Sequence, residues 1–156
     1  MTSKGDISPQ NWAALVDAAP AIARAISASG GSAGKSEQEL DAFIQFASDA
    51  AVSGEGDSLL GGLAVDVAAR LAVGVPAPEG DVYVDGLEKA RRAGAILAVE
   101  ADPGEAASVR AWYLAGARAV AAAVKEGGVL GIGGADVSDW ERETTQSVAD
   151  ALGSTE

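Results

Sequence analysis

Alanine is the feature that most limits how this chain can fold, because it supplies 35 of the 156 residues. Alanine has the highest helix propensity, since it loses no side-chain entropy in a helix, and its small side chain lets helices pack closely. Between the alanines, the larger apolar residues recur at spacings of three and four. That period is typical of amphipathic helices, so the sequence predicts an all-α fold.

Helix start signals divide the first half of the chain into three predicted helices. The first begins at Pro9, and Pro20 should kink or break it near its middle because proline has no amide hydrogen to donate. The second begins with a capping box formed by Ser36 and Glu39. The third is predicted to begin near Asp57, where apolar residues at helical spacing resume.

The second half of the chain predicts three more helices. The fourth covers residues 83–101 and follows a loop rich in proline and glycine. Asp102 serves as the N-cap of the fifth helix, which ends at Gly127, and Ser138 opens a sixth that ends at Gly153. These signals predict an all-α bundle of five or six helices.

The predicted bundle forms one domain over residues 1–156, with residues 1–7 and 154–156 frayed at its ends. An α/β alternative would make residues 94–99 a buried strand, but apolar residues around this segment are spaced as in a helix. The tryptophans Trp12, Trp112 and Trp140 are interpreted as anchors of the core.

The side chains that the chain lacks exclude several kinds of chemistry. Without cysteine there is no thiolate nucleophile, disulfide, zinc knuckle or iron–sulfur cluster. Without histidine there is no Ser-His-Asp triad, no imidazole proton shuttle and no ordinary transition-metal site. The sequence therefore predicts no catalytic residue set and no cofactor.

Charge and hydropathy limit the partners of the chain. It carries 23 acidic and 11 basic side chains, a net charge of −12, which disfavours binding to nucleic-acid phosphates and anionic lipid. The N-terminal residues are polar, unlike a signal peptide, and the longest apolar stretch, residues 111–124, is interrupted by Arg118. We therefore expect a soluble cytoplasmic protein that binds neither nucleic acid nor membrane.

The C-terminal third carries a family resemblance. Residues 125–134, KEGGVLGIGG, and the helix that follows resemble a group of small uncharacterised bacterial all-helical proteins. In that group a stretch of the form KEGG-x-LG-x-GG…VS-x-x-E joins the last two helices. The likeness extends to the pair Trp112-Tyr113 and departs at Val129, where phenylalanine is expected. It implies a single helical domain and no particular activity. A looser resemblance, to tellurite-resistance-B-like helical domains, rests on two glycine-rich loops that each precede a serine-capped helix.

One short segment has the form of a phosphate-binding loop. Gly34, Lys35 and Ser36 follow a glycine-rich run, as in loops whose backbone amides cradle phosphates. However, the complete motif needs a glycine where Ser29 stands and a strand before it, and here an alanine-rich helix precedes. A flexible link before a capped helix is the competing interpretation.

A second segment resembles the start of a calcium-binding loop. Asp81 and Asp85 occupy the first and fifth positions of such a loop, and Gly86 occupies the sixth. The twelfth position should be a bidentate glutamate, but it is Arg92. The alternative is an acidic helix N-terminus, which the helix dipole favours.

The most distinctive segment is a glycine-rich link between the last two predicted helices. Its glycines permit a tight turn or close backbone approach, and its apolar members favour packing over the core. We interpret it as a structural turn or as a binding surface. The segment consists of Gly127, Gly128, Val129, Leu130, Gly131, Ile132, Gly133 and Gly134.

These observations favour a non-enzymatic, acidic helical accessory protein that acts through a protein partner or a second copy of itself. The first alternative is a stress-linked module that binds divalent cations. The second is an enzyme that binds a phosphate ester at the Lys35 loop. An acidic DNA mimic is a further alternative from charge alone, but the acids are spread over both halves of the chain.

Overall fold

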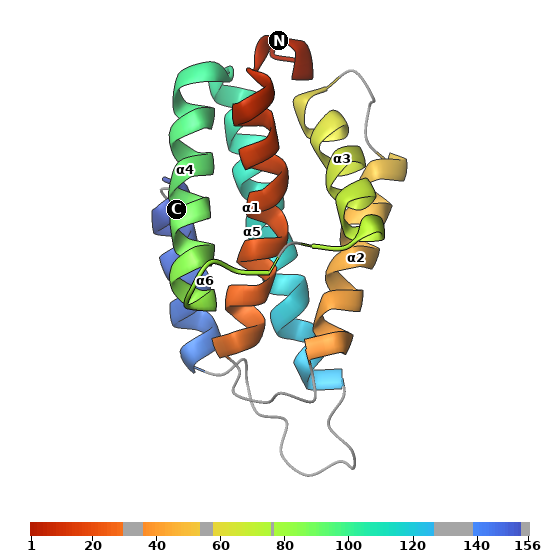
Figure 1. Ribbon diagram of the computed structural model, residues 1–156, viewed down its shortest axis with the longest axis vertical. Coiled ribbons are helices and arrows are strands. Elements are labelled where there is room, and N and C mark those ends of the chain that lie inside the picture. Colours follow the sequence, from red (N-terminus) through yellow and green to blue (C-terminus); the bar gives the residue numbers. More distant parts are fainter. Residues whose placement is uncertain (30–35, 54–57, 76, 127–138, 154–156) are drawn as a thin grey trace.

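The computed structural model describes residues 1–29, 36–53, 58–75, 77–126 and 139–153, with backbone alone for 36–39, 124–126 and 140–141. Within these residues a short 3₁₀ helix, η1, precedes six α-helices (Figure 1). The prediction of an all-α bundle is confirmed. The elements are η1 (Lys4–Asp6), α1 (Pro9–Ser29), α2 (Ser36–Ser53), α3 (Leu59–Val73), α4 (Val82–Glu100), α5 (Pro103–Glu126) and α6 (Asp139–Leu152).

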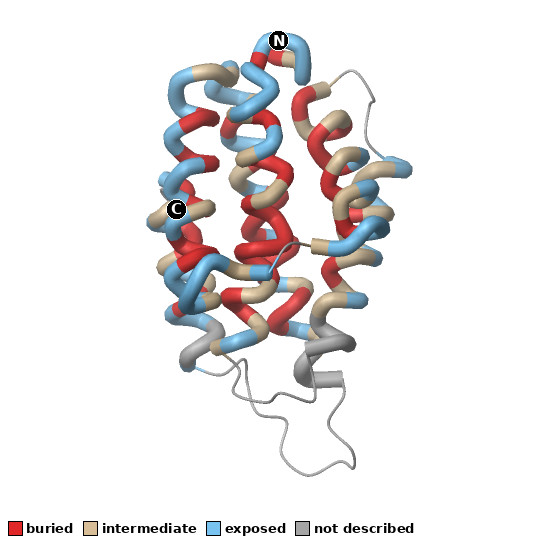
Figure 2. The backbone as a smooth tube through the Cα atoms, viewed as in Figure 1, coloured by how far each residue is buried: buried red, intermediate tan, exposed pale blue. Residues whose placement is uncertain are grey.

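The helices form three layers of two. Helices α1 and α5 occupy the middle layer and contact all the others, whereas α2 and α3 pack on one side and α4 and α6 on the other (Figure 1). Buried residues follow the faces that the helices turn toward one another, and exposed residues cover the outer faces (Figure 2). The core therefore surrounds α1 and α5.

Helix α1 continues through Pro20 as one helix, so the chain is not broken there, and the predicted kink stays a prediction. The proline ring removes one backbone hydrogen bond, but both Pro20 and the residues around it are buried among neighbouring helices. On α5, the hydroxyl of Tyr113 donates a hydrogen bond of 2.7 Å to the carbonyl oxygen of Leu15, five residues before the proline. Tertiary packing thus supports the helix where the local sequence disfavours it.

The N-terminal segment also differs from its prediction. Residues 1–7 were expected to fray, but Thr2 and Ile7 are buried. The Thr2 hydroxyl accepts a hydrogen bond of 2.7 Å from the backbone amide of Asp102. The backbone amide of Thr2 donates a hydrogen bond to the carboxylate of Glu105. The segment is therefore anchored to the turn between α4 and α5, because that turn offers partners for its backbone.

Local capping signals place the start of two helices. Ser58 accepts a hydrogen bond from the amide of Gly61 at the start of α3, one residue after the predicted Asp57. Asp81 accepts hydrogen bonds from the amides of Tyr83 and Val84 at the start of α4.

Residues 94–99 lie inside α4, so the alternative that made them a buried strand is wrong.

Glycines in α4 allow close contact with two other helices. A Cβ atom at Gly86 would lie 2.8 Å from the backbone oxygen of Ala21 in α1. A Cβ atom at Gly94 would lie 2.6 Å from the backbone oxygen of Leu152 in α6. Both distances are too short for any side chain, so α4 packs directly on the backbones of its neighbours.

In the parts of the chain that the structure describes, no helix has the length and hydrophobicity needed to cross a membrane.

Candidate ligand-binding pocket

Two of the predicted sites fall largely outside the described residues. The glycine-rich link Gly127–Gly134 lies wholly outside them. Gly34 and Lys35 also lie outside, and Ser36 is the first residue of α2, with only its backbone described. The proposals that these segments bind a partner or a phosphate ester therefore stay predictions.

The two aspartates of the calcium-like loop have structural partners. Asp81 caps α4 through one carboxylate oxygen, which accepts both amide hydrogen bonds. Asp85 is buried, and its carboxylate forms an ion pair of 3.0 Å with Lys89 one turn later. A third acidic side chain does not join them, since no group of three potential metal ligands occurs within the described ranges. Divalent-cation binding at Asp81 and Asp85 stays a prediction that this arrangement does not favour.

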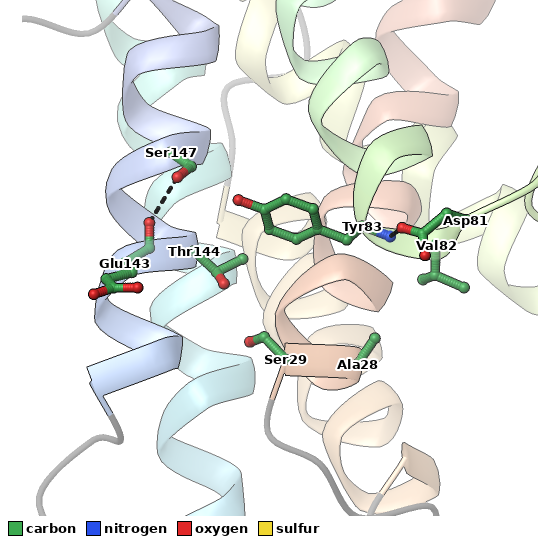
Figure 3. Close-up of a pocket in the computed structure, with 8 residues that line it drawn as sticks. All are labelled: Ala28, Ser29, Asp81, Val82, Tyr83, Glu143, Thr144 and Ser147. Carbon is green, nitrogen blue, oxygen red and sulfur yellow. Dashed lines mark hydrogen bonds between the residues drawn. The ribbon is translucent and has the colours of Figure 1, made fainter.

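An open pocket lies between three helices that are distant in sequence. It has a volume of about 490 Å³. It lies between the C-terminal end of α1, the N-terminal end of α4 and the first half of α6 (Figure 3). We call it the α1–α4–α6 pocket. The residues that line it are Ala28, Ser29, Asp81, Val82, Tyr83, Glu143, Thr144 and Ser147. This volume is in the range of pockets that bind small organic molecules.

Hydroxyl groups dominate the polar interior of the pocket. Ser29 donates its hydroxyl hydrogen to the carbonyl oxygen of Ile26 at 2.7 Å, and Ser147 donates its own to the carbonyl of Glu143 at 2.9 Å. Both serine oxygens are therefore left with lone pairs that can accept hydrogen bonds but have no hydrogen to give.

Thr144 is the buried polar residue of the pocket. The residue is only 2% exposed. It projects from α6 into the space that faces α1 (Figure 3). Because a hydrogen bond in the protein interior is electrostatically stronger than one in water, the hydroxyl of Thr144 is a suitable contact for a ligand.

Tyr83 closes the pocket from the opposite side. Its ring extends from the first turn of α4 toward α6, with the hydroxyl foremost (Figure 3), and 38% of the residue is exposed. The ring offers a flat apolar face, and the hydroxyl can donate or accept. Together with Val82 and Ala28 it gives the pocket apolar walls around a polar centre.

The charged residues of the pocket are both acidic. Asp81 and Glu143 are exposed and flank it on opposite sides, and the carboxylate of Glu143 lies on the outer side of α6 (Figure 3). Among the described lining residues there is neither lysine nor arginine. These two carboxylates favour a cation over an anion at the pocket.

The aromatic residues away from the pocket are structural. Trp12 is buried, and its indole nitrogen donates a hydrogen bond of 2.7 Å to Asp66 on α3. Trp112 stacks on Phe46 with ring centroids 5.7 Å apart. Its indole nitrogen is buried without a partner in the described part of the chain, and Trp112 does not line the α1–α4–α6 pocket. The interpretation of Trp12 and Trp112 as core anchors fits this burial, and the side chain of Trp140 lies outside the described part of the structure.

The sequence pattern pointed to one residue of the pocket, Asp81, but as a possible calcium ligand. Ser29, Tyr83, Thr144 and Ser147 belong to no spacing motif, since they come from three helices that meet only in the folded chain. Of these four residues, only Thr144 occupies a position in the sequence that could have indicated a functional role. A polar residue on the apolar face of α6 is unusual, and burial of such a residue commonly indicates a hydrogen-bonding role.

Comparison with known proteins found no match. No family model fits the chain, and no curated protein and no solved structure matches it. The resemblance to small bacterial helical proteins carrying the KEGG-x-LG-x-GG stretch stays a prediction.

Proposed function

We propose that this protein is a non-enzymatic binding protein that acts through a protein partner, and that the partner engages the end of the bundle where the α1–α4–α6 pocket opens. The observation that carries the proposal is the pocket itself, which combines apolar walls with the hydroxyl of the buried residue Thr144. Pockets of this composition are the usual sites of ligand contact in folded domains.

The hydrogen bonds in the pocket support binding rather than catalysis. Ser29 and Ser147 donate their hydroxyl hydrogens to backbone carbonyls, so neither is paired with a base that could remove the proton. The chain contains no histidine to act as that base and no cysteine to replace the serine. The lining residues therefore resemble a recognition surface more than a reaction centre.

The charge of the chain supports a partner with a basic surface. The net charge is −12, and the two charged residues of the pocket, Asp81 and Glu143, are both acidic. Complementary charge accelerates association and orients the partner, and its effect weakens as salt increases. A basic partner would therefore meet this end of the bundle in a favourable orientation.

Affinity capture with an obstructed pocket tests the proposal. Ala28 is exposed at the pocket, so Ala28→Trp should obstruct it without disturbing the core. Ala72 is an exposed alanine at the end of α3, away from the pocket, so Ala72→Trp is the matched control. Native and Ala72→Trp protein should retain the same partner from a native extract, and Ala28→Trp should lose it.

Salt provides the second arm of this experiment. A partner held through charge should dissociate when NaCl is raised from about 0.05 to 0.5 M, since the screening length falls from about 14 to 4 Å. Failure to capture any reproducible partner, or equal capture by both tryptophan variants, would contradict the proposal.

A further inference from the structure

We infer that the α1–α4–α6 pocket binds an alkylammonium group, held by the hydroxyl oxygens of Ser29, Thr144 and Ser147 and covered by the ring of Tyr83. This inference rests on the proposed binding function and adds the chemistry of the ligand. The same ammonium group can belong to a free amine or to a lysine side chain of the partner protein.

The hydrogen-bond requirements of the pocket indicate a ligand that donates. The serine oxygens of residues 29 and 147 can only accept, because their hydrogens already bond to Ile26 and Glu143. Thr144 adds a third hydroxyl oxygen at the buried side of the pocket. An ammonium group carries three donors and no acceptor, so it is complementary to a group of oxygens with free lone pairs.

The charge and the apolar surface favour a positively charged alkyl ligand over a neutral or anionic one. Asp81 and Glu143 flank the pocket, and the lining residues within the described part of the chain include no lysine or arginine that would repel a cation. The ring of Tyr83 points across the pocket (Figure 3), where its face can attract a cation and its edge can pack against methylene groups. An anion would find neither a cationic side chain nor a surplus of donors.

Matched small probes test the role of the charge. Titration of ¹⁵N-labelled protein with n-pentylamine, which is protonated at pH 7, is compared with 1-pentanol at equal ionic strength. We expect saturable chemical-shift changes at residues 28–29, 82–83 and 144–147 with n-pentylamine, and binding by 1-pentanol weaker by about tenfold, equivalent to about 1.4 kcal/mol. Equal affinity for the two probes would overturn the inference, as would the absence of saturable binding by n-pentylamine.

Two variants test the residues. Thr144→Val removes the hydroxyl of this buried residue at nearly constant shape, and its urea midpoint, measured beside that of the native protein, establishes that the variant folds. Thr145→Val, one residue along α6 and outside the pocket lining, is the matched control. We expect Thr144→Val and Tyr83→Leu each to weaken n-pentylamine binding by about three- to tenfold. Affinities equal to that of the control would overturn the inference.

A lysine probe separates the two sources of the ammonium group. N-acetyl-lysine methylamide carries the same alkylammonium on a peptide backbone. Binding by this probe assigns the pocket to a lysine of the partner, and its exclusion while n-pentylamine still binds assigns the pocket to a free amine. If both amines fail but Ala28→Trp still abolishes partner capture, the ammonium inference is wrong and the proposed function stands.

Discussion

At the scale of single residues, the most buried polar contact joins Tyr113 to the backbone of Leu15. Burial raises the pKa of the Tyr113 hydroxyl above its ordinary value, so the group stays protonated and acts as a donor at any pH at which the protein folds. Its acceptor, the carbonyl of Leu15, lies five residues before Pro20, and the carbonyl that the proline leaves without an amide donor is that of Val16. The hydroxyl therefore adds a tertiary hydrogen bond to the part of α1 that precedes the proline.

We expect Tyr113→Phe to lower the free energy of unfolding by about 1 kcal/mol, because one buried hydrogen bond is lost while the ring stays in place. Urea denaturation followed by circular dichroism measures the change. Tyr83→Phe makes the same substitution at an exposed site and should change stability by less than about 0.5 kcal/mol. Equal effects of the two variants would show that the Leu15 contact contributes nothing.

A second residue-scale contact connects the N-terminal segment to α3 through Asp66. Burial on its own would raise the pKa of the Asp66 carboxyl, but hydrogen bonds from Lys4 and Trp12 and the charge of Lys4 outweigh it and lower the pKa. A carboxyl with a lowered pKa in the folded state adds stability above its unfolded pKa of about 3.9. That contribution disappears as the pH falls through the folded-state value.

Asp66→Asn should therefore destabilise the protein at pH 7, by about 0.5–1 kcal/mol for a partly exposed group with two hydrogen bonds. At a pH below the folded-state pKa the difference between the variant and the native protein should shrink toward zero. Urea midpoints measured from pH 7 to pH 2.5 follow this change. Asp41→Asn, at an exposed site on α2, should show no such dependence. A constant difference at all pH values for Asp66→Asn would contradict the assignment.

At the scale of secondary structure, the contacts of α4 depend on the absence of side chains. A Cβ atom at Gly86 would lie 2.5 Å from the Cβ of Ala25, and the equivalent atom at Gly94 would meet the end of α6. The same end of α6 is held by Arg110, whose guanidinium donates to the carbonyl of Leu152 at 2.9 Å and to that of Gly94 at 3.3 Å. Helix α4 therefore joins the middle and outer layers through its backbone.

Gly86→Ala should lower the free energy of unfolding by about 1–3 kcal/mol, because α1 and α4 must move apart. Gly62→Ala is the control, since its added Cβ would meet only ordinary contacts at 3.7 Å or more. In α3 that change should raise stability by about 0.5–1 kcal/mol, because alanine favours helix over glycine. Stabilisation by both variants would mean that α1 and α4 do not approach as closely as described.

At the scale of the whole molecule, excess negative charge opposes the compact state. The net charge is −12, and acids exceed bases in both halves of the chain. Apart from the pair that Lys89 forms with the buried Asp85, the ion pairs that we identify among the described residues, such as that between Arg70 and Asp17, are partly or largely exposed, and such pairs contribute about 0–1 kcal/mol each. Repulsion among the remaining acids is therefore the larger electrostatic effect.

Stability should consequently increase when NaCl is raised from about 0.01 to 0.2 M, as the screening length falls from about 30 to 7 Å. The urea midpoint at each salt concentration measures this. Replacing two exposed acids, Asp41→Lys and Glu79→Lys, changes the net charge from −12 to −8 and should reduce the salt effect. A midpoint that falls with salt would show that the ion pairs dominate instead.

Local sequence was sufficient to predict the helices because capping and apolar spacing act within one or two turns. Pro9 and Pro103 begin helices as predicted, and α4 begins one residue from its expected start at Tyr83. The candidate pocket could not be predicted in the same way. Its residues Ser29 and Thr144 are 115 positions apart, and no periodic pattern relates them.

The sequence by itself determined that this chain forms alanine-rich helices, where most of them begin, and that histidine and cysteine chemistry is excluded. Only the tertiary structure decided that α1 continues through Pro20, that residues 1–7 are anchored, and that three helix ends enclose a pocket around Thr144. The physical reason is the range of the interactions. Helix propensity and capping are settled among neighbouring residues, whereas burial, close backbone contact and cavities depend on which helices meet after the chain has folded.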